Sequence, residues 1–150
     1  MSEQKNAAPR GRILIVDDDP NTLEILRRWL NREGYTTISA DNGRASLDVL
    51  EKEPVDVILL DVMMPGMDGL QVCERLRDHS SWRSIPVVLL TAKDDIETRS
   101  RGMLLGVSEY LTKPVNKLEL FARLQAQLHT RELERRMAAT AATVADMGKK

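Results

Sequence analysis

Five short apolar runs, each followed by a segment with helical spacing, limit what this 150-residue chain can fold into. In most of the runs the apolar residues are continuous rather than alternating, which is typical of strands that helices cover on both faces. Strands that alternate with helices form a parallel sheet with right-handed crossovers. We therefore predict an α/β, doubly wound, five-stranded parallel sheet with flavodoxin-like strand order 2-1-3-4-5 and five helices. The predicted strands are 12–16, 35–40, 55–60, 85–90 and 109–112.

The composition narrows the class of protein. Hydrophobic residues make up 42% of the chain but aromatic residues only 3%, so the core must be built from aliphatic side chains. A net charge of -1 gives no field that would favour nucleic acid or an anionic membrane surface. Neither a signal peptide nor an apolar run near the ~20 residues of a membrane span is visible. We expect a cytoplasmic protein that binds neither nucleic acid nor membranes directly.

The chain divides into three parts. Residues 1–11 are polar and are predicted to be a disordered tail, and residues 12–128 hold the folded domain. Residues 129–150 continue the last helix, with an apolar seam that steps by four and three residues as in a coiled coil. A frayed, solvated tail is the alternative. We favour a helix that pairs with a second copy and leads to an output domain absent from this chain. The seam residues are Leu133, Met137, Thr140, Val144 and Met147.

Polar groups stand at the ends of four predicted strands. Because parallel strands all end at one edge of the sheet, these groups can converge there. Asp17, Asp18 and Asp61 offer oxygen ligands alone, a set that suits Mg²⁺ or Mn²⁺. The alternative is that Asp18 and Asp19 cap the following helix; we assign capping to Asp19 and metal binding to Asp17 and Asp18.

This arrangement favours capture of a phosphoryl group. Phosphoryl transfer depends on neutralising charge and on in-line positioning more than on proton chemistry. Asp61 would attack phosphorus and form an acyl phosphate. Thr91 would donate a hydrogen bond to a phosphoryl oxygen, and Lys113 would bind one as a cation. The sequence has no glycine-rich phosphate loop, so the donor must be something other than a nucleotide bound here.

Four segments together resemble the receiver domain of bacterial two-component response regulators. The resemblance covers about residues 12–128, and it implies that Asp61 accepts a phosphoryl group from the phosphohistidine of a sensor histidine kinase or phosphotransfer protein. The four segments are Ile13–Pro20 (ILIVDDDP), Asp61–Gly69 (DVMMPGMDG), Leu89–Ala92 (LLTA) and Tyr110–Pro114 (YLTKP).

The same resemblance implies the roles of the metal-site residues. Asp18 and Asp61 match direct metal ligands, and Asp17 matches a ligand that acts through water. The backbone carbonyl of Met63 matches a further ligand. Mg²⁺ is the expected cofactor, with Mn²⁺ able to substitute.

The resemblance also implies a conformational switch. Thr91 and Tyr110 match a pair in which the hydroxyl moves toward the phosphoryl group and the aromatic ring turns inward. Lys113 and Pro114 match a cis peptide. Ala92 is small, which leaves the site accessible to a donor or to water.

The expected output surface consists of the fourth helix, the fifth strand and the fifth helix, which flank Thr91 and Tyr110. Phosphorylation would alter this surface to control homodimerisation or an output partner. Glu109 and Arg123 are candidates for an ion pair across the dimer, although exposed pairs contribute only ~0–1 kcal/mol.

Two other functions fit parts of the pattern. An Mg²⁺-dependent aspartyl-phosphate phosphohydrolase also uses clustered acids, but that family has an Asp-x-Asp pair at the first strand. Here the first-strand acids are adjacent and Asp61 stands on the third strand. The other alternative is a dimerisation module with a vestigial site, against which the complete set of acids, Thr91 and Lys113 argues. We expect a switch that catalyses only its own phosphorylation and dephosphorylation, with no output enzyme in this chain.

Overall fold

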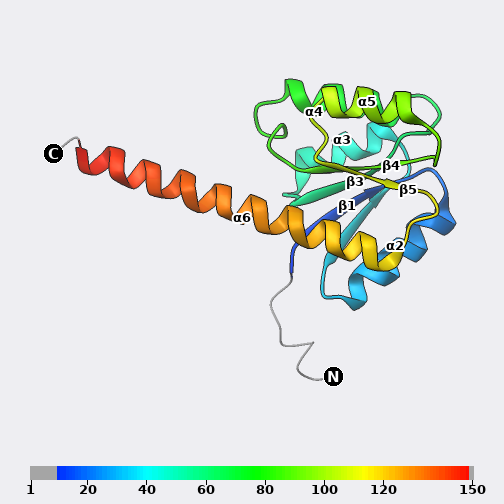
Figure 1. The fold of residues 1–150 in the computed structure, drawn as a ribbon, viewed down its shortest axis with the longest axis horizontal. Helices are drawn as coiled ribbons and strands as arrows, with labels where there is room; N and C mark the ends of the chain where they lie inside the picture. Colours follow the sequence, from blue (N-terminus) through cyan, green and yellow to red (C-terminus); the bar gives the residue numbers. More distant parts are fainter. Residues whose placement is uncertain (1–9, 149–150) are drawn as a thin grey trace.

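The computed structural model describes residues 10–148 and contains one five-stranded sheet. All neighbouring strands are parallel, and their order is β2-β1-β3-β4-β5 (Figure 1). The predicted fold class, with its strand order and five helices, is confirmed. The predicted tail 1–11 falls mostly on residues outside the described range. The strands are β1 (Arg12–Val16), β2 (Thr36–Ala40), β3 (Val57–Asp61), β4 (Val87–Thr91) and β5 (Glu109–Thr112).

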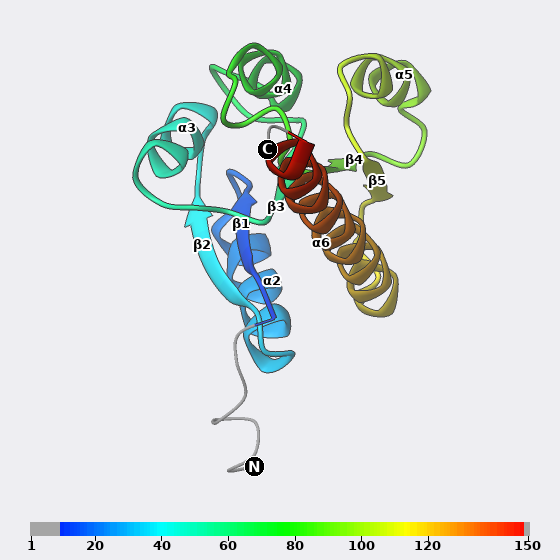
Figure 2. The same ribbon diagram turned by 90° about the vertical axis from the view of Figure 1, so that its left-hand side faces the viewer.

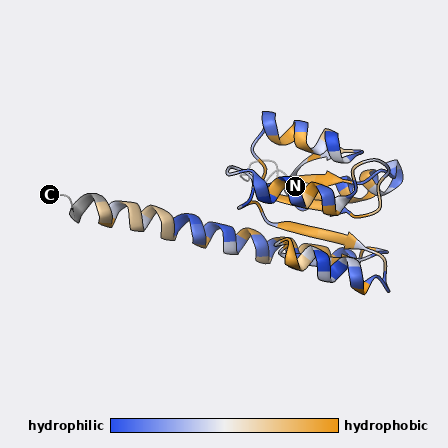
Figure 3. Ribbon diagram, turned by 90° about the horizontal axis from the view of Figure 1, so that it is seen from above, coloured by the Kyte–Doolittle hydropathy of each residue, from blue (hydrophilic) through white to orange (hydrophobic). Residues whose placement is uncertain are grey.

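The helices cover both faces of the sheet (Figures 1 and 2). Side chains of a strand point alternately to opposite faces, so each strand supplies two cores. On β1, Leu14 and Val16 pack with α3, α4 and their neighbours, whereas Ile13 and Ile15 pack with α2 and α6. Figure 3 shows the strands as hydrophobic between helices of mixed hydropathy. The helices are α2 (Pro20–Arg32), α3 (Gly43–Lys52), α4 (Gly69–Asp78), α5 (Ile96–Leu104) and α6 (Lys117–Gly148).

Helix starts at the carboxyl edge of the sheet are fixed by local caps. Asp19 accepts a hydrogen bond from the backbone N–H of Asn21 at 3.0 Å, with Pro20 in the first turn, which confirms it as the cap of α2. Asp68 forms a capping box with Gln71 at the start of α4. These caps set where the loops after β1 and β3 end.

Gly69 allows α4 to begin directly against the end of β3. A Cβ atom at this position would lie 2.5 Å from the carbonyl oxygen of Asp61 and 2.8 Å from the Cα of Val62. Both are backbone atoms and cannot move aside, so the close approach requires glycine. The tight contact holds the β3–α4 turn, and with it Asp61, in one position.

Cys73 is buried on the inner face of α4. Burial raises the pKa of its thiol to about 12. The residue therefore remains a protonated core side chain at neutral pH.

The last helix, α6, is continuous from Lys117 to Gly148 and extends well beyond the sheet (Figure 1). The first turns of α6 pack on the core. Two arginines in the middle of the helix bind residues that precede β4 and β3, at the amino-terminal ends of the strands. Arg131 donates to the backbone carbonyl of Ser84 at 3.0 Å, and Arg135 pairs with Asp56 at 3.3 Å. No helix among residues 10–148 is long and apolar enough to cross a membrane.

Two leucines of α6 provide a matched test of this packing. Leu120 is fully buried, whereas Leu118, two residues earlier, is 77% exposed. We expect Leu120→Ala to lower the free energy of unfolding by about 2–5 kcal/mol, because it deletes buried methyl groups and leaves a cavity. Leu118→Ala should change it by less than about 0.5 kcal/mol. Urea denaturation measures both, and equal losses would contradict the described position of α6.

Candidate functional site

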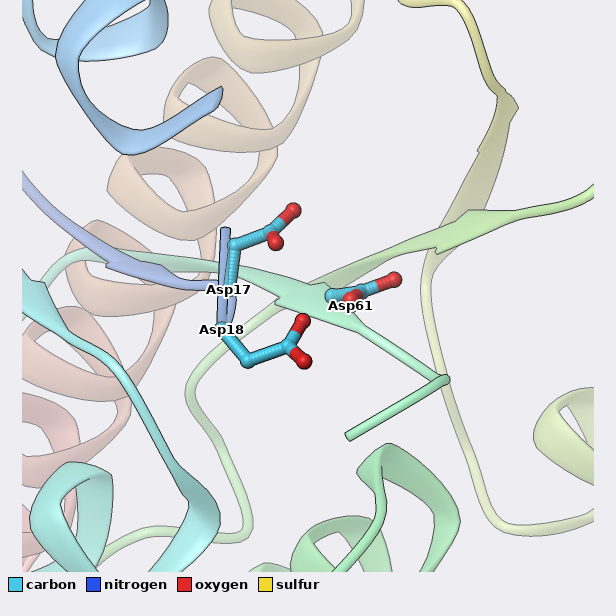
Figure 4. A group of neighbouring side chains, drawn as sticks. All are labelled: Asp17, Asp18 and Asp61. Atoms are coloured by element: carbon cyan, nitrogen blue, oxygen red, sulfur yellow. The ribbon is translucent and has the colours of Figure 1, made fainter. Parts of the chain in front are cut away.

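Three carboxylates gather where β1 and β3 end side by side in the sheet. Asp17 and Asp18 directly follow β1, and Asp61 is the last residue of β3. One carboxylate oxygen from each residue lies within 4.8 Å of the other two, and Figure 4 shows the three side chains around a common space. Asp17 and Asp61 are buried, while Asp18 is exposed. The predicted convergence of strand ends is therefore present for all three acids.

Lys113 connects the two buried carboxylates. Its Nζ lies 3.0 Å from Oδ2 of Asp17 and 2.9 Å from Oδ1 of Asp61. The residue follows β5, its backbone N–H donates to the carbonyl of Thr91 at 2.8 Å, and its peptide bond to Pro114 is cis. Three carboxylates and one ammonium leave a formal excess of two negative charges in the cluster. That excess is the charge of one divalent cation.

Burial perturbs the titration of Asp61 and of Lys113. Burial raises the pKa of Asp61, and the neighbouring Asp17 raises it further, while the hydrogen bond from Lys113 acts in the opposite direction. For Lys113, burial lowers the pKa, but its hydrogen bonds with Asp61 and Asp17 outweigh burial, so that the net shift is upward. Lys113 thus stays charged at neutral pH, and its stabilising effect is lost only as the pH rises through its raised pKa.

The donor set fits a hard divalent cation. Carboxylate oxygens are the ligands that Mg²⁺ prefers, and they carry the charge that it needs. Asp17 already accepts from the backbone N–H of Asp19 at 2.9 Å and from Lys113, so both its oxygens are engaged. Within residues 10–148, no hydrogen bond engages the carboxylate of Asp18. Asp18 is therefore the acid most available to a metal.

Thr91 and Tyr110 lie on adjacent strands next to the cluster. Thr91 is the buried last residue of β4, the neighbour of β3. Tyr110 lies on β5, opposite Leu89 of β4, and its side chain is 39% exposed. Ala92 and Met63 are exposed on the loops after β4 and β3, at the carboxyl edge of the sheet.

Sequence reasoning missed Arg99, which contacts both Thr91 and Tyr110. Its Nε lies 3.4 Å from Oγ1 of Thr91, and its guanidinium lies 4.6 Å from the centroid of the Tyr110 ring. In the sequence Arg99 is one of several charged residues on a polar helix, and no motif marks it. Only the packing of α5 beside β4 and β5 brings it to these two side chains.

Glu109 and Arg123 form an ion pair within the chain, with 3.5 Å between Oε2 and Nη1. The pair joins β5 to α6 along the expected output surface. The two side chains thus already have a partner in one protomer, and a dimer would have to exchange that contact to pair them across an interface.

Removal of the Asp61 charge should stabilise the metal-free protein. The folded state holds a proton on Asp61 more readily than the unfolded chain, so the contribution of this group is most favourable below its ordinary pKa of 3.8 and is lost as the pH rises through the raised folded pKa. At pH 7 in EDTA we expect Asp61→Asn to raise the free energy of unfolding by on the order of 1 kcal/mol. Thermal unfolding measures this.

The exposed Asp48 of α3 provides the control, because Asp48→Asn should change stability by less than about 0.5 kcal/mol. Added Mg²⁺ should raise the melting temperature of the wild type more than that of Asp61→Asn, since a ligand stabilises only the fold that binds it. A destabilised Asp61→Asn in EDTA would contradict the described balance of burial and charge.

Comparison with known families matches residues 13–125 to the response regulator receiver domain. The chain is 44% identical over 117 residues to the response regulator MprA of Mycolicibacterium vanbaalenii, a match that covers 78% of this chain and 50% of that protein. This chain thus spans about half the length of such curated relatives.

Solved structures give the same family. A response regulator from Chloroflexus aurantiacus J-10-fl matches with a TM-score of 0.77 and 36% identity, over 81% of this chain and 98% of that one. Full-length FixJ from B. japonicum matches with a TM-score of 0.79 and 27% identity, over 93% of this chain and 68% of that one. The chain belongs to the response regulator receiver domain family.

Proposed function

We propose that this chain is a phosphorylation-dependent switch in which Asp61 is the phosphoryl acceptor. The observation that carries the proposal is the position of Asp61, whose carboxylate is held by Lys113 within an acidic cluster at the open edge of the sheet. The acid is fixed by its neighbours, and the formal charge of the cluster favours a divalent cation. Membership in the receiver family supports the same role.

The residues of the site suit an in-line transfer. A carboxylate oxygen of Asp61 attacks the phosphorus of a phosphohistidine; the new O–P bond forms as the N–P bond breaks, and the electron pair leaves with the imidazole nitrogen of the donor. Lys113 offsets negative charge on the phosphoryl oxygens, and the Thr91 hydroxyl donates to one of them. Asp18, Asp61 and, as the family resemblance implies, the carbonyl of Met63 would hold Mg²⁺, and the ion would supply Lewis-acid stabilisation of that charge.

The partner that fits this chemistry is a sensor histidine kinase or a phosphotransfer protein. The phosphoryl donor must approach Asp61 from outside the domain, and the exposed Met63 and Ala92 leave room for it at the edge of the sheet. A phosphohydrolase of the Asp-x-Asp class gains no support, because Asp61 stands alone at the end of β3.

The output surface of the switch consists of α5, β5 and α6. Phosphorylation would draw the Thr91 hydroxyl toward Asp61 and let the half-exposed Tyr110 ring turn inward. The surface carries large exposed apolar side chains that a partner or second copy would cover. They are Ile96, Met103, Leu104, Tyr110 and Leu118.

Phosphorylation of Asp61 can be tested directly. We expect incubation with acetyl phosphate and Mg²⁺ to add the mass of one phosphoryl group to the intact protein. EDTA and Asp61→Asn should each abolish this addition. The control is Asp41→Asn, because the exposed Asp41 follows β2 at the same edge of the sheet but lies outside the acidic cluster. Intact-protein mass spectrometry measures the product, and an unmodified wild type would refute the proposed function.

The extension of α6 can be tested for pairing between two copies. A helix of this length that leaves the domain has little stabilisation of its own in water, and its seam residues Leu133, Met137 and Val144 are exposed. We expect Met137→Glu with Val144→Glu to abolish self-association of the phosphorylated protein in sedimentation equilibrium. A charge placed in the apolar seam would lose its hydration on pairing.

The matched control carries the same two charges on the other side of the helix, as Ala138→Glu with Ala142→Glu. These residues lie away from the seam and should leave self-association unchanged. If the seam variant associates as the wild type does, the coiled-coil proposal fails and the output surface of α5, β5 and α6 becomes the remaining dimer site.

A further inference from the structure

Arg99, near the start of α5, holds the loop that follows β4. Its Nη2 donates to the backbone carbonyl of Lys93 at 2.8 Å and lies 3.5 Å from that of Ala92. The same nitrogen donates to Oγ1 of Thr112 on β5 at 2.9 Å. One guanidinium thus connects α5, the β4–α5 loop and β5. A movement of this loop relative to β5 would lengthen at least one of these contacts unless the Arg99 side chain rearranges.

Arg99 also contacts each member of the Thr91/Tyr110 pair. Its Nε donates to Oγ1 of Thr91 at 3.4 Å, close to the longest distance for such a bond. Its guanidinium lies over the Tyr110 ring at 4.6 Å, a cation–π distance. Because Arg99 is only partly exposed and Tyr110 is 39% exposed, the ring rests on the guanidinium with one side toward solvent.

The contacts of Arg99 with Thr91 and Tyr110 exist only while both side chains keep the positions described above. If the Thr91 hydroxyl shifts toward Asp61, it leaves a contact with Arg99 that is already long. If the Tyr110 ring turns inward, it leaves the face of the guanidinium. Both movements lose an interaction with the same side chain, so Arg99 makes them depend on each other and favours the state in which neither has occurred.

We propose that Arg99 stabilises the resting state of the switch by binding Thr91, Tyr110 and the β4–α5 loop at once, and that phosphorylation has to displace it. The inference rests on the proposed function, because it assumes that Asp61 is the acceptor and that Thr91 and Tyr110 respond to it. Arg99 is a positioning residue: it raises the free energy needed to reach the active state without touching the phosphoryl group.

Arg101 provides the matched control. It is an exposed arginine on the same helix, and within residues 10–148 no hydrogen bond involves its side chain. Arg99→Gln removes one positive charge from α5 together with the cation–π contact to the Tyr110 ring. Arg101→Gln removes one positive charge from the same helix without removing that contact. Thr112→Val removes one partner of Arg99 and leaves Arg99, Thr91 and Tyr110 in place.

The test is a titration of the full chain with beryllium fluoride, a phosphoryl mimic, in the presence of Mg²⁺. Ring ¹³C NMR of labelled tyrosine reports the state of the switch, because the chain has only two tyrosines and the buried Tyr35 serves as the reference. In Arg99→Gln we expect the Tyr110 signal to lie part-way toward the saturated position before any beryllium fluoride is added. The half-saturating concentration should fall by at least about threefold. Thr112→Val should shift the Tyr110 signal and the half-saturating concentration in the same directions but by smaller amounts. Arg101→Gln should match the wild type in both readouts.

A merely structural role of Arg99 would lower thermal stability and leave the Tyr110 signal and the half-saturating concentration unchanged; that result refutes the inference. A higher half-saturating concentration in Arg99→Gln refutes it as well. If Arg99→Gln does not fold, the Tyr110 signal and the half-saturating concentration of Thr112→Val test the inference instead, and wild-type values of both refute it. A wild type that binds no beryllium fluoride in Mg²⁺ refutes the proposed function instead, so the two failures are distinguishable.

Discussion

The bridge from Lys113 to Asp17 and Asp61 is the interaction on which the rest of the site depends. The two buried carboxylates lie side by side, and both burial and the neighbouring Asp17 raise the pKa of Asp61. An ammonium within 3.0 Å of both makes the arrangement tolerable in the folded protein. Lys113 reaches them because β5 ends at the same edge as β1 and β3. The parallel sheet is therefore required for the charge balance as much as for the core.

Lys113 offsets only part of the negative charge of the acidic cluster. One ammonium does not neutralise three acids, and the charged form of Asp61 is disfavoured by its surroundings. Under the proposed function, a cation or a phosphoryl–cation pair that neutralises the remaining charge would find carboxylate ligands already in place. The two aliphatic cores on either side of the sheet stabilise the strands that carry the cluster, and the close approach of Gly69 to the backbone of Asp61 fixes the turn after β3.

The order of apolar runs and polar residues along the chain predicted the sheet and the groups at its carboxyl edge. Continuous apolar runs predicted a sheet buried on both faces, and the residues after each run predicted which groups meet at its edge. The predicted strand order 2-1-3-4-5 correctly placed the run at 35–40 as an outer strand of the sheet, where β2 lies. Contacts made by long polar side chains from α5 and α6 could not be predicted. Arg99, Arg131 and Arg135 each bind partners far from them in sequence or on other elements, and an arginine on a charged helix gives no signal of its partner.

These long-range contacts determine how a change at Asp61 would reach the extension of α6. Under the proposed switch, movement of Thr91 and Tyr110 acts on β5, and Glu109, the neighbour of Tyr110, binds Arg123 on α6. The same helix is packed on the core through Leu120, and Arg131 binds the backbone carbonyl of Ser84, which precedes β4. A helix fixed at both places cannot bend freely between them. Under the proposed switch, a displacement at β5 that overcomes the contact of Arg131 would therefore move α6 as a unit, including its exposed seam.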